Sequence, residues 1–146
     1  MKTIDDELRK YREVTETQLR EQIRDLCKIT GWAFYFTFNS MHSPKGMPDL
    51  ILSKTLADEN TVILFPELKR EQGKLSPPQI MWLELLDKTQ GVFCFVWTPS
   101  QIEMICETLR SKDLPDLITA WEIQAVYARN RFRINLGMQE KGVTLC

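Results

Sequence analysis

Two short stretches decide the fold: GMPDLI at residues 46–51 and PELK at residues 66–69. The first opens an apolar run and the second closes another. Each run has the length and the Val, Ile, Leu and Phe content of a buried strand. Asp49, Glu67 and Lys69 therefore stand at the ends of core strands, where a charge needs a partner because it has left water. A divalent cation held between the two carboxylates would be such a partner.

Residues two apart in a strand point to the same face, so the pattern predicts that Glu67 and Lys69 project together. If Asp49 lies on the neighbouring strand, two carboxylates and one ammonium group converge. Two carboxylates and a backbone carbonyl suit Mg²⁺ or Mn²⁺, which prefer oxygen ligands. We expect metal-assisted hydrolysis, in which Lys69 either orients the attacking water or stabilises the charge that develops in the transition state.

The segments around these stretches predict an α/β fold. Thr15 and Gln18 have capping-box spacing before an apolar stripe, and Gly31 suits the end of that helix. Ser76 and Pro77 suit the start of a second helix. Strands are expected at residues 32–38, 49–52, 61–69 and 92–97, and further helices at residues 102–109 and from residue 114 to about residue 129.

This αβββαβ order predicts a mixed central sheet flanked by helices. The first three strands are joined closely enough to run antiparallel, whereas the helix before the fourth strand implies a parallel crossover. Residues 1–13 form a charged leader without a clear apolar face. We expect one domain over residues 1–146, with a core at about 14–110 and a C-terminal helical extension at 111–146.

Composition and charge narrow the class of protein. A net charge of −1 argues against binding nucleic acid by overall charge alone, but it leaves room for a local basic groove. No apolar run is long enough for a transmembrane helix and the N-terminus lacks a signal-peptide stretch, so we expect a cytoplasmic protein. Four cysteines without CxxC spacing and a single histidine, His42, argue against a zinc site.

Several pieces of the sequence together resemble a known family. KGMPDLI at 45–51, ELK at 67–69, GKLSPPQ at 73–79, WL at 82–83 and VWTP at 96–99 follow in this order. From about Glu16 to Leu109 the chain resembles the PD-(D/E)XK nuclease superfamily and, within it, the small stand-alone VRR-NUC type. The resemblance implies a restriction-endonuclease-like core. Pro66 departs from the pattern, because proline is rare in a central strand: either the strand bends or bulges there, or its N–H side is unpaired.

The resemblance also implies roles for individual residues. Gln79 would face the site and orient the water or the phosphate, and Glu16 matches an acidic position that completes the metal shell. The implied catalytic set is Asp49, Glu67, Lys69 and Gln79, and the metal set is Asp49, Glu67, the backbone carbonyl of Leu68, and Glu16. The candidate nucleic-acid-binding set is His42, Lys45, Gly46, Arg70 and Lys74, for which a solvated loop is the alternative interpretation.

These observations predict a Mg²⁺- or Mn²⁺-dependent DNA endonuclease that acts on branched, flapped or junction DNA and recognises backbone and shape over sequence. A homodimer would help so small a chain to span a junction. Two alternatives stay open. One is a nuclease-like fold that has lost turnover and binds nucleic acid or protein. The other is a metal-dependent hydrolase of a small phosphoester, which the lack of a phosphate-cradling glycine loop disfavours.

Overall fold

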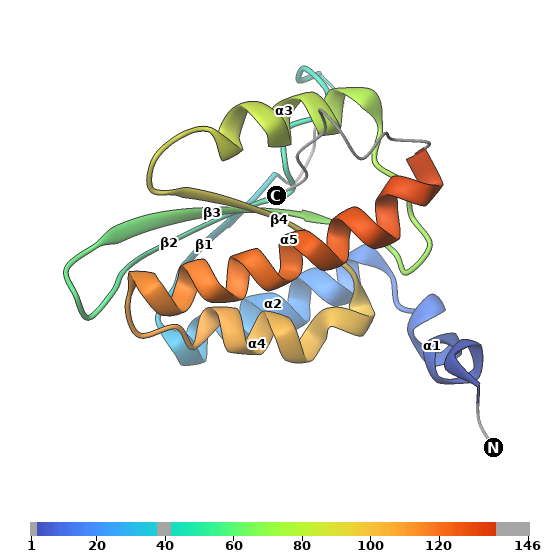
Figure 1. The fold of residues 1–146 in the computed structure, drawn as a ribbon, viewed down its shortest axis with the longest axis horizontal. Coiled ribbons are helices and arrows are strands. Elements are labelled where there is room, and N and C mark those ends of the chain that lie inside the picture. The colour runs from blue at the N-terminus through green and yellow to red at the C-terminus, as the bar shows by residue number, and fades with distance from the viewer. Residues whose placement is uncertain (1–2, 38–41, 137–146) are drawn as a thin grey trace.

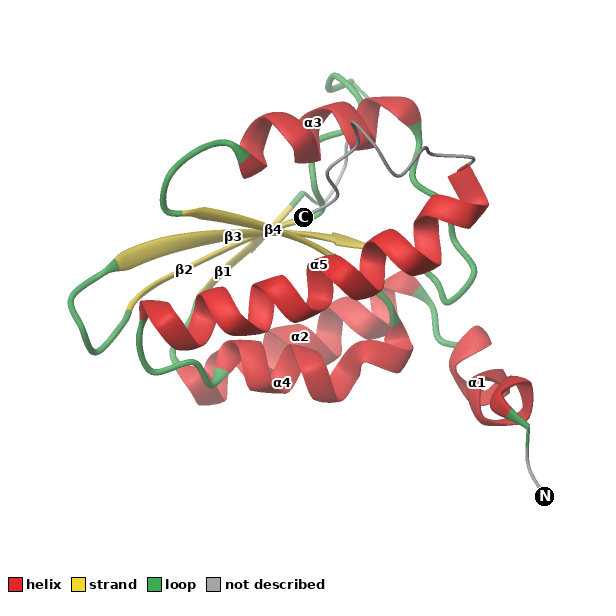
Figure 2. Ribbon diagram, in the orientation of Figure 1, coloured by secondary structure: helices red, strands yellow, loops and turns green. Residues whose placement is uncertain are grey.

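The computed structural model describes residues 3–37 and 42–136 and contains a mixed four-stranded sheet between two layers of helices (Figure 1). Helices α2, α4 and α5 cover one face of the sheet, and α3 covers the other (Figure 2). In chain order the elements are α1 (Ile4–Arg12), α2 (Glu16–Thr30), β1 (Ala33–Phe36), β2 (Leu50–Thr55), β3 (Thr61–Leu68), α3 (Pro77–Asp87), β4 (Val92–Trp97), the short 3₁₀ helix η1 (Pro99–Gln101), α4 (Ile102–Leu109) and α5 (Leu114–Leu136).

The sheet has the strand order β1-β2-β3-β4, as the connections predict. β1 pairs with β2 and β2 with β3 in antiparallel fashion, because short connections return the chain beside itself. β4 runs parallel to β3, since helix α3 carries the chain back across the sheet between them. β3 is thereby a central strand with a neighbour on each side. The α/β fold with a mixed sheet is confirmed.

The two faces of the sheet bury separate apolar clusters. Neighbouring residues of a strand point to opposite faces, so Leu64 and Phe65 of β3 belong to different clusters. A strand that is buried on both faces reads as a continuous apolar run, which is the pattern of β3 and β4. The larger cluster includes Leu19, Ile23, Leu52, Leu64, Trp97, Ile105 and Leu117, and the smaller one, under α3, is Phe65, Leu75, Leu83, Cys94 and Val96.

The ends of the helices follow the capping residues that the sequence contains. Thr15 caps α2 and exchanges hydrogen bonds with Gln18, and Gly31 ends this helix with a φ of 84°. Ser76 caps α3 in the same way, with Pro77 in the first turn. These caps fix where α2 and α3 begin, and both beginnings lie beside the strand ends that carry the acidic residues.

Several predicted boundaries differ from the structure. The sequence predicts a charged leader at residues 1–13 without naming a helix there, and in the structure residues 4–12 form α1, which begins at a capping box made by Thr3 and Asp6. Helix α5 continues to Leu136, beyond the expected end near residue 129. β1 ends at Phe36, and Phe38 lies outside the described residues. Among the described helices, α5 included, none combines the length and apolar character that a membrane span needs.

Pro66 lies inside the central strand β3 and leaves its pairing with β4 intact. It pairs with Phe95 in a parallel ladder that continues to Leu68. Backbone N–H groups of a strand alternate between its two edges. The N–H of Lys69 donates to β4, so position 66 faces β2, where the antiparallel ladder has already ended at Leu64. Pro66 therefore stands at a position where an N–H group would have no strand partner, and the β4 ladder is not interrupted.

Candidate active site

Asp49 and Glu67 meet where β2 begins and β3 ends. The backbone N–H of Leu68 donates to Oδ2 of Asp49 over 2.9 Å, beyond the point where the two strands stop pairing. Continuing the register past Leu52 and Leu64 brings Asp49 opposite Glu67. The antiparallel turn between β2 and β3 thus makes neighbours of two acids that are well separated in sequence.

Glu67 is buried with its carboxyl group only partly satisfied. The side chain is 1% exposed, and Oε1 accepts a hydrogen bond of 2.8 Å from Nε2 of Gln79. Oε2 has no hydrogen-bond partner among the described residues. Burial, reinforced by the adjacent Asp49, raises the pKa of Glu67 to about 9, against the lowering effect of Lys69. A buried acid with an unused oxygen beside a second acid is the arrangement that a bound cation would stabilise.

Gln79 links the start of helix α3 to the acidic pair. Its Oε1 accepts from the backbone N–H of Ser76 over 2.8 Å, which completes the capping box of α3. Its Nε2 is then directed to Glu67. The capping interaction therefore orients the amide, and this glutamine is half-buried rather than a surface residue of the helix.

Glu16 begins helix α2 and approaches the same place from the other layer. It lines a hollow of about 100 Å³ together with Asp49 and Leu68, and its charge contributes to the raised pKa of Glu67. The side chain is exposed. Within the described residues no three or more His, Cys, Asp or Glu side chains are grouped closely enough to hold a metal ion. The acidic centre therefore consists of Asp49 and Glu67, and Glu16 lies at the edge of the hollow beside it.

Lys69 follows directly after β3 and is half-buried. Its backbone N–H donates to the carbonyl of Trp97 over 3.0 Å, which extends the pairing with β4 by one residue. Gly73 lies against its side chain: a Cβ at this glycine would stand 3.2 Å from Cδ of Lys69. The loop after β3 thus packs around the stem of the lysine and limits where its ammonium group can lie.

Glu71 is a buried residue that the sequence pattern did not single out. It is 1% exposed, and its carboxyl group accepts hydrogen bonds from the backbone N–H of Ser100, at 3.0 Å, and from the Ser100 hydroxyl. These bonds tie the loop that follows Lys69 to the start of η1. A glutamate in a polar loop carries no signal of such burial, because its partner lies far along the chain.

The residues predicted to bind nucleic acid are exposed, apart from the half-buried Gly46. His42, Lys45 and Lys74 are exposed. Arg70 is exposed too. Its Nη2 donates to the carbonyl of Arg12 over 3.1 Å, so one N–H group of its guanidinium binds the last residue of α1.

Gly46 has a structural reason to be glycine. Its φ is 105°, and a Cβ there would lie 2.5 Å from the backbone of Pro78. The loop before Asp49 therefore packs directly on the first turn of α3, on the helix that also carries Gln79.

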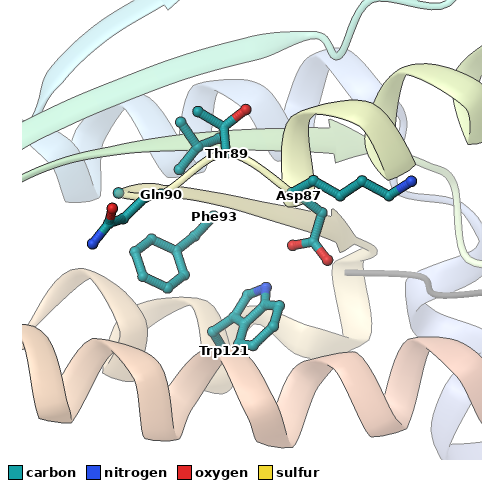
Figure 3. A pocket seen from close by; sticks show the side chains of 8 residues that line it. Asp87, Thr89, Gln90, Phe93 and Trp121 are labelled. Atoms are coloured by element: carbon teal, nitrogen blue, oxygen red, sulfur yellow. The ribbon is translucent and has the colours of Figure 1, made fainter.

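A second pocket lies at the opposite end of the sheet and is separate from the acidic pair. It measures about 260 Å³, and the aromatic rings of Phe93 and Trp121 face it beside Asp87 and Gln90 (Figure 3). Phe93 is next to the first residue of β4, whereas the end of β4 lies beside Leu68. No residue of the predicted site lines this pocket.

Comparison with known proteins identifies the family. A family model described as the VRR-NUC domain matches residues 6–100, more than half of the chain. The chain belongs to the VRR-NUC domain family. A solved structure described as a VRR-NUC domain is 24% identical, covers 63% of this chain and 94% of its own, and has a TM-score of 0.48. No curated protein matches the chain.

VRR-NUC domains are nuclease domains, so cleavage of nucleic acid is the class of activity that the family brings. The VRR-NUC match spans every residue that the sequence placed in the site, from Glu16 to Gln79, and stops at the start of η1. Helices α4 and α5 follow it. The acidic pair and the elements that position it therefore all belong to the matched region.

Proposed function

We propose that this VRR-NUC chain is a divalent-metal-dependent DNA endonuclease that cleaves branched or flapped DNA. The carboxyl group of Glu67 carries the proposal. It is buried, it touches the acid Asp49, and one of its oxygens has no hydrogen-bond partner among the described residues. A cation would offset both the cost of burying the Glu67 carboxyl group and its repulsion from Asp49. No other group among the described residues offsets both fully.

Three oxygen groups would hold the ion: the carboxylates of Asp49 and Glu67 and the backbone carbonyl of Leu68. The N–H of Leu68 points to Asp49, and the N–H and carbonyl of one strand residue face the same edge. Glu16 is the further acid that borders the hollow. An all-oxygen set favours Mg²⁺ or Mn²⁺. When bound, such an ion supplies polarisation of a phosphoryl oxygen and acidification of water.

Lys69 and Gln79 are the protein's own contributions to the reaction. The positive charge of Lys69 lies near Glu67, where it would orient the attacking water or stabilise the negative charge of the transition state. Gln79 holds Glu67 by a hydrogen bond, so we assign it the orientation of water or phosphate through that carboxyl group.

The exposed residues beside the site would receive the DNA. Lys45 and Lys74 offer ammonium groups for backbone phosphates, with Arg70, His42 and the loop at Gly46 alongside. Recognition through phosphates suits a substrate defined by its shape. A homodimer would let two such small chains engage both arms of a branched substrate, and sedimentation of the protein with and without junction DNA tests this part of the proposal.

The test is cleavage of linear, flapped and four-way DNA with Mg²⁺, Mn²⁺ or EDTA. We expect metal-dependent cleavage, strongest on the branched substrates. Lys69→Ala should lower the rate at least ~1000-fold and largely spare DNA binding, while the exposed Lys88→Ala at the far end of the sheet keeps the wild-type rate. Binding of DNA without cleavage of any substrate would instead favour a binding module, and turnover of small phosphoesters alone would favour the other hydrolase.

A further inference from the structure

A row of arginines on α2 leads away from the acidic hollow. Arg20 and Arg24 follow Glu16 at intervals of one helical turn, so the three lie on one side of the helix. That side covers β1, whose Phe34 and Phe36 point to the same face with ring centroids 6.0 Å apart. The two layers thus place two cations over two aromatic rings beside the candidate active site.

Each guanidinium group lies over one ring. The Arg20 guanidinium carbon is 4.2 Å from the centroid of the Phe36 ring, and that of Arg24 is 5.7 Å from the centroid of Phe34. An arginine stacked on an aromatic face keeps its N–H fork in one plane and free to donate at its edge. Stacking therefore orients these side chains before any ligand arrives.

Arg20 is also a wall of the hollow that Asp49 lines. Its side chain is 26% exposed, and its buried Nε has no hydrogen-bond partner in the described part of the chain. The Glu21 carboxylate is 3.6 Å from this nitrogen, too far for a hydrogen bond. Such a half-exposed ion pair contributes little to stability. The Nε donor of Arg20 is therefore left without a protein acceptor among the described residues.

Lys54 of β2 also lies near an aromatic ring, but it differs from the two arginines. It lies over Trp32 at 5.9 Å, but its Nζ donates to the carbonyl of Thr30 over 2.5 Å at the end of α2. This lysine serves the helix terminus, so it is not available to a ligand in the way that Arg20 and Arg24 are.

We propose that Arg20 and Arg24 form a phosphate-binding pair that holds the nucleic-acid backbone beside the cleavage site. The ligand class rests on the proposed function, because a nuclease must hold a phosphodiester chain next to its acidic pair. Planar guanidinium forks match phosphate oxygens in bidentate fashion. One helical turn separates the two arginines by about 6 Å along α2, so they can engage two different phosphates of one strand.

The experiment measures DNA binding in EDTA, where no metal-dependent turnover occurs. Fluorescence anisotropy over a range of KCl concentrations gives the affinity and its salt slope for labelled single-stranded and duplex oligonucleotides. Arg20→Gln and Arg24→Gln should each weaken binding by about tenfold at low salt. Each should also reduce the salt slope by about 0.7 on single strands or about 0.9 on duplex. The single-strand and duplex arms show which form of backbone the pair holds.

Two further variants separate phosphate binding from a structural or general charge effect. Lys88→Gln removes an exposed charge at the far end of the sheet, away from the candidate active site, and its slope should stay near that of the wild type. Arg20→Lys keeps the charge but loses the planar fork, so it should fold and still weaken binding by about threefold. Affinities and slopes of Arg20→Gln and Arg24→Gln that match Lys88→Gln would overturn the inference.

The outcome can be told apart from failure of the proposed function. If the wild type cleaves no DNA but Arg20→Gln still lowers the salt slope, the nuclease proposal fails and the arginine pair stands. If the wild type cleaves DNA and both arginine variants keep its salt slope, the nuclease proposal stands and the arginine pair fails.

Discussion

Two glutamates of this chain are equally buried but occupy contrasting surroundings. Glu67 at the end of β3 and Glu71 in the following loop are each 1% exposed. Glu71 accepts two hydrogen bonds from Ser100, so its burial is matched by donors. Glu67 accepts one bond, from Gln79, and faces another acid. Burial alone therefore does not set the two acids apart; the supply of matching hydrogen-bond donors does.

This contrast gives the two glutamates opposite expected effects on activity. Glu67→Gln should lower DNA cleavage at least ~1000-fold, because it removes a metal ligand and the charge that holds the ion. Glu71→Gln should keep the rate of the folded protein within about threefold of the wild type, because the carboxyl group of Glu71 is bound by Ser100. Cleavage rates per folded molecule test this, and comparable losses in the two variants would remove the distinction.

The raised pKa of Glu67 predicts a pH dependence of stability in the metal-free protein. Folding raises this pKa from 4.5 to about 9, so the folded state binds the proton more tightly than the unfolded chain. The resulting stabilisation is fully present below pH 4.5 and is lost as the pH rises through about 9. Melting in EDTA should show that the Tm of Glu67→Gln exceeds that of the wild type by a margin that grows with pH. A margin that is constant or shrinks with pH would contradict the account.

Glu71 should matter for stability where Glu67 matters for activity. Glu71→Gln should destabilise the fold by about 2 kcal/mol, because the neutral amide replaces an acceptor of two hydrogen bonds in a buried place. Urea unfolding in EDTA measures this change, with the exposed Glu107→Gln on α4 as a matched control that should stay near the wild type. An unchanged midpoint for Glu71→Gln would mean that the bonds to Ser100 do not hold the loop.

Gly73 tests the loop that follows β3 and contains Glu71. A Cβ at this position would press on the side chain of Lys69 and on the carbonyl of Arg70, each 3.2 Å away. Gly73→Ala should therefore slow cleavage by about tenfold, because it displaces the ammonium group, while metal binding at Asp49 and Glu67 persists. Single-turnover cleavage and metal titration measure the two effects separately. Loss of metal binding without loss of rate would reverse this assignment.

The parts of the fold that rest on local signals were predictable from the sequence. Capping residues such as Thr15 and Ser76 placed the helix starts, and continuous apolar runs placed the buried strands. Short connections and one helical crossover set the strand directions, which in turn bring Asp49 beside Glu67. The spacing of a Pro-Asp pair and a Glu-x-Lys motif therefore contained enough information to locate the acidic pair.

The remainder depends on contacts between distant segments, which a single sequence does not reveal. Glu71 finds its donors at Ser100, and Arg20 finds its aromatic surface on β1 only when α2 packs across the sheet. Helix α1 was not predicted, because its residues show no clear apolar face, although a capping box at Thr3 marks its start. The bond from Gln79 to Glu67 likewise follows from how α3 docks, although the capping residue itself was visible in the sequence.

Metal binding measured by calorimetry tests the central claim most directly. Mn²⁺ should bind the wild type and Glu71→Gln alike at pH 7, and binding should release a proton because Glu67, with a pKa of about 9, must lose it. Titrations in buffers of different ionisation enthalpy measure that proton. Glu67→Gln should show neither binding nor proton release. Binding of Mn²⁺ to Glu67→Gln with the affinity of the wild type would contradict the assignment of Glu67 as a metal ligand.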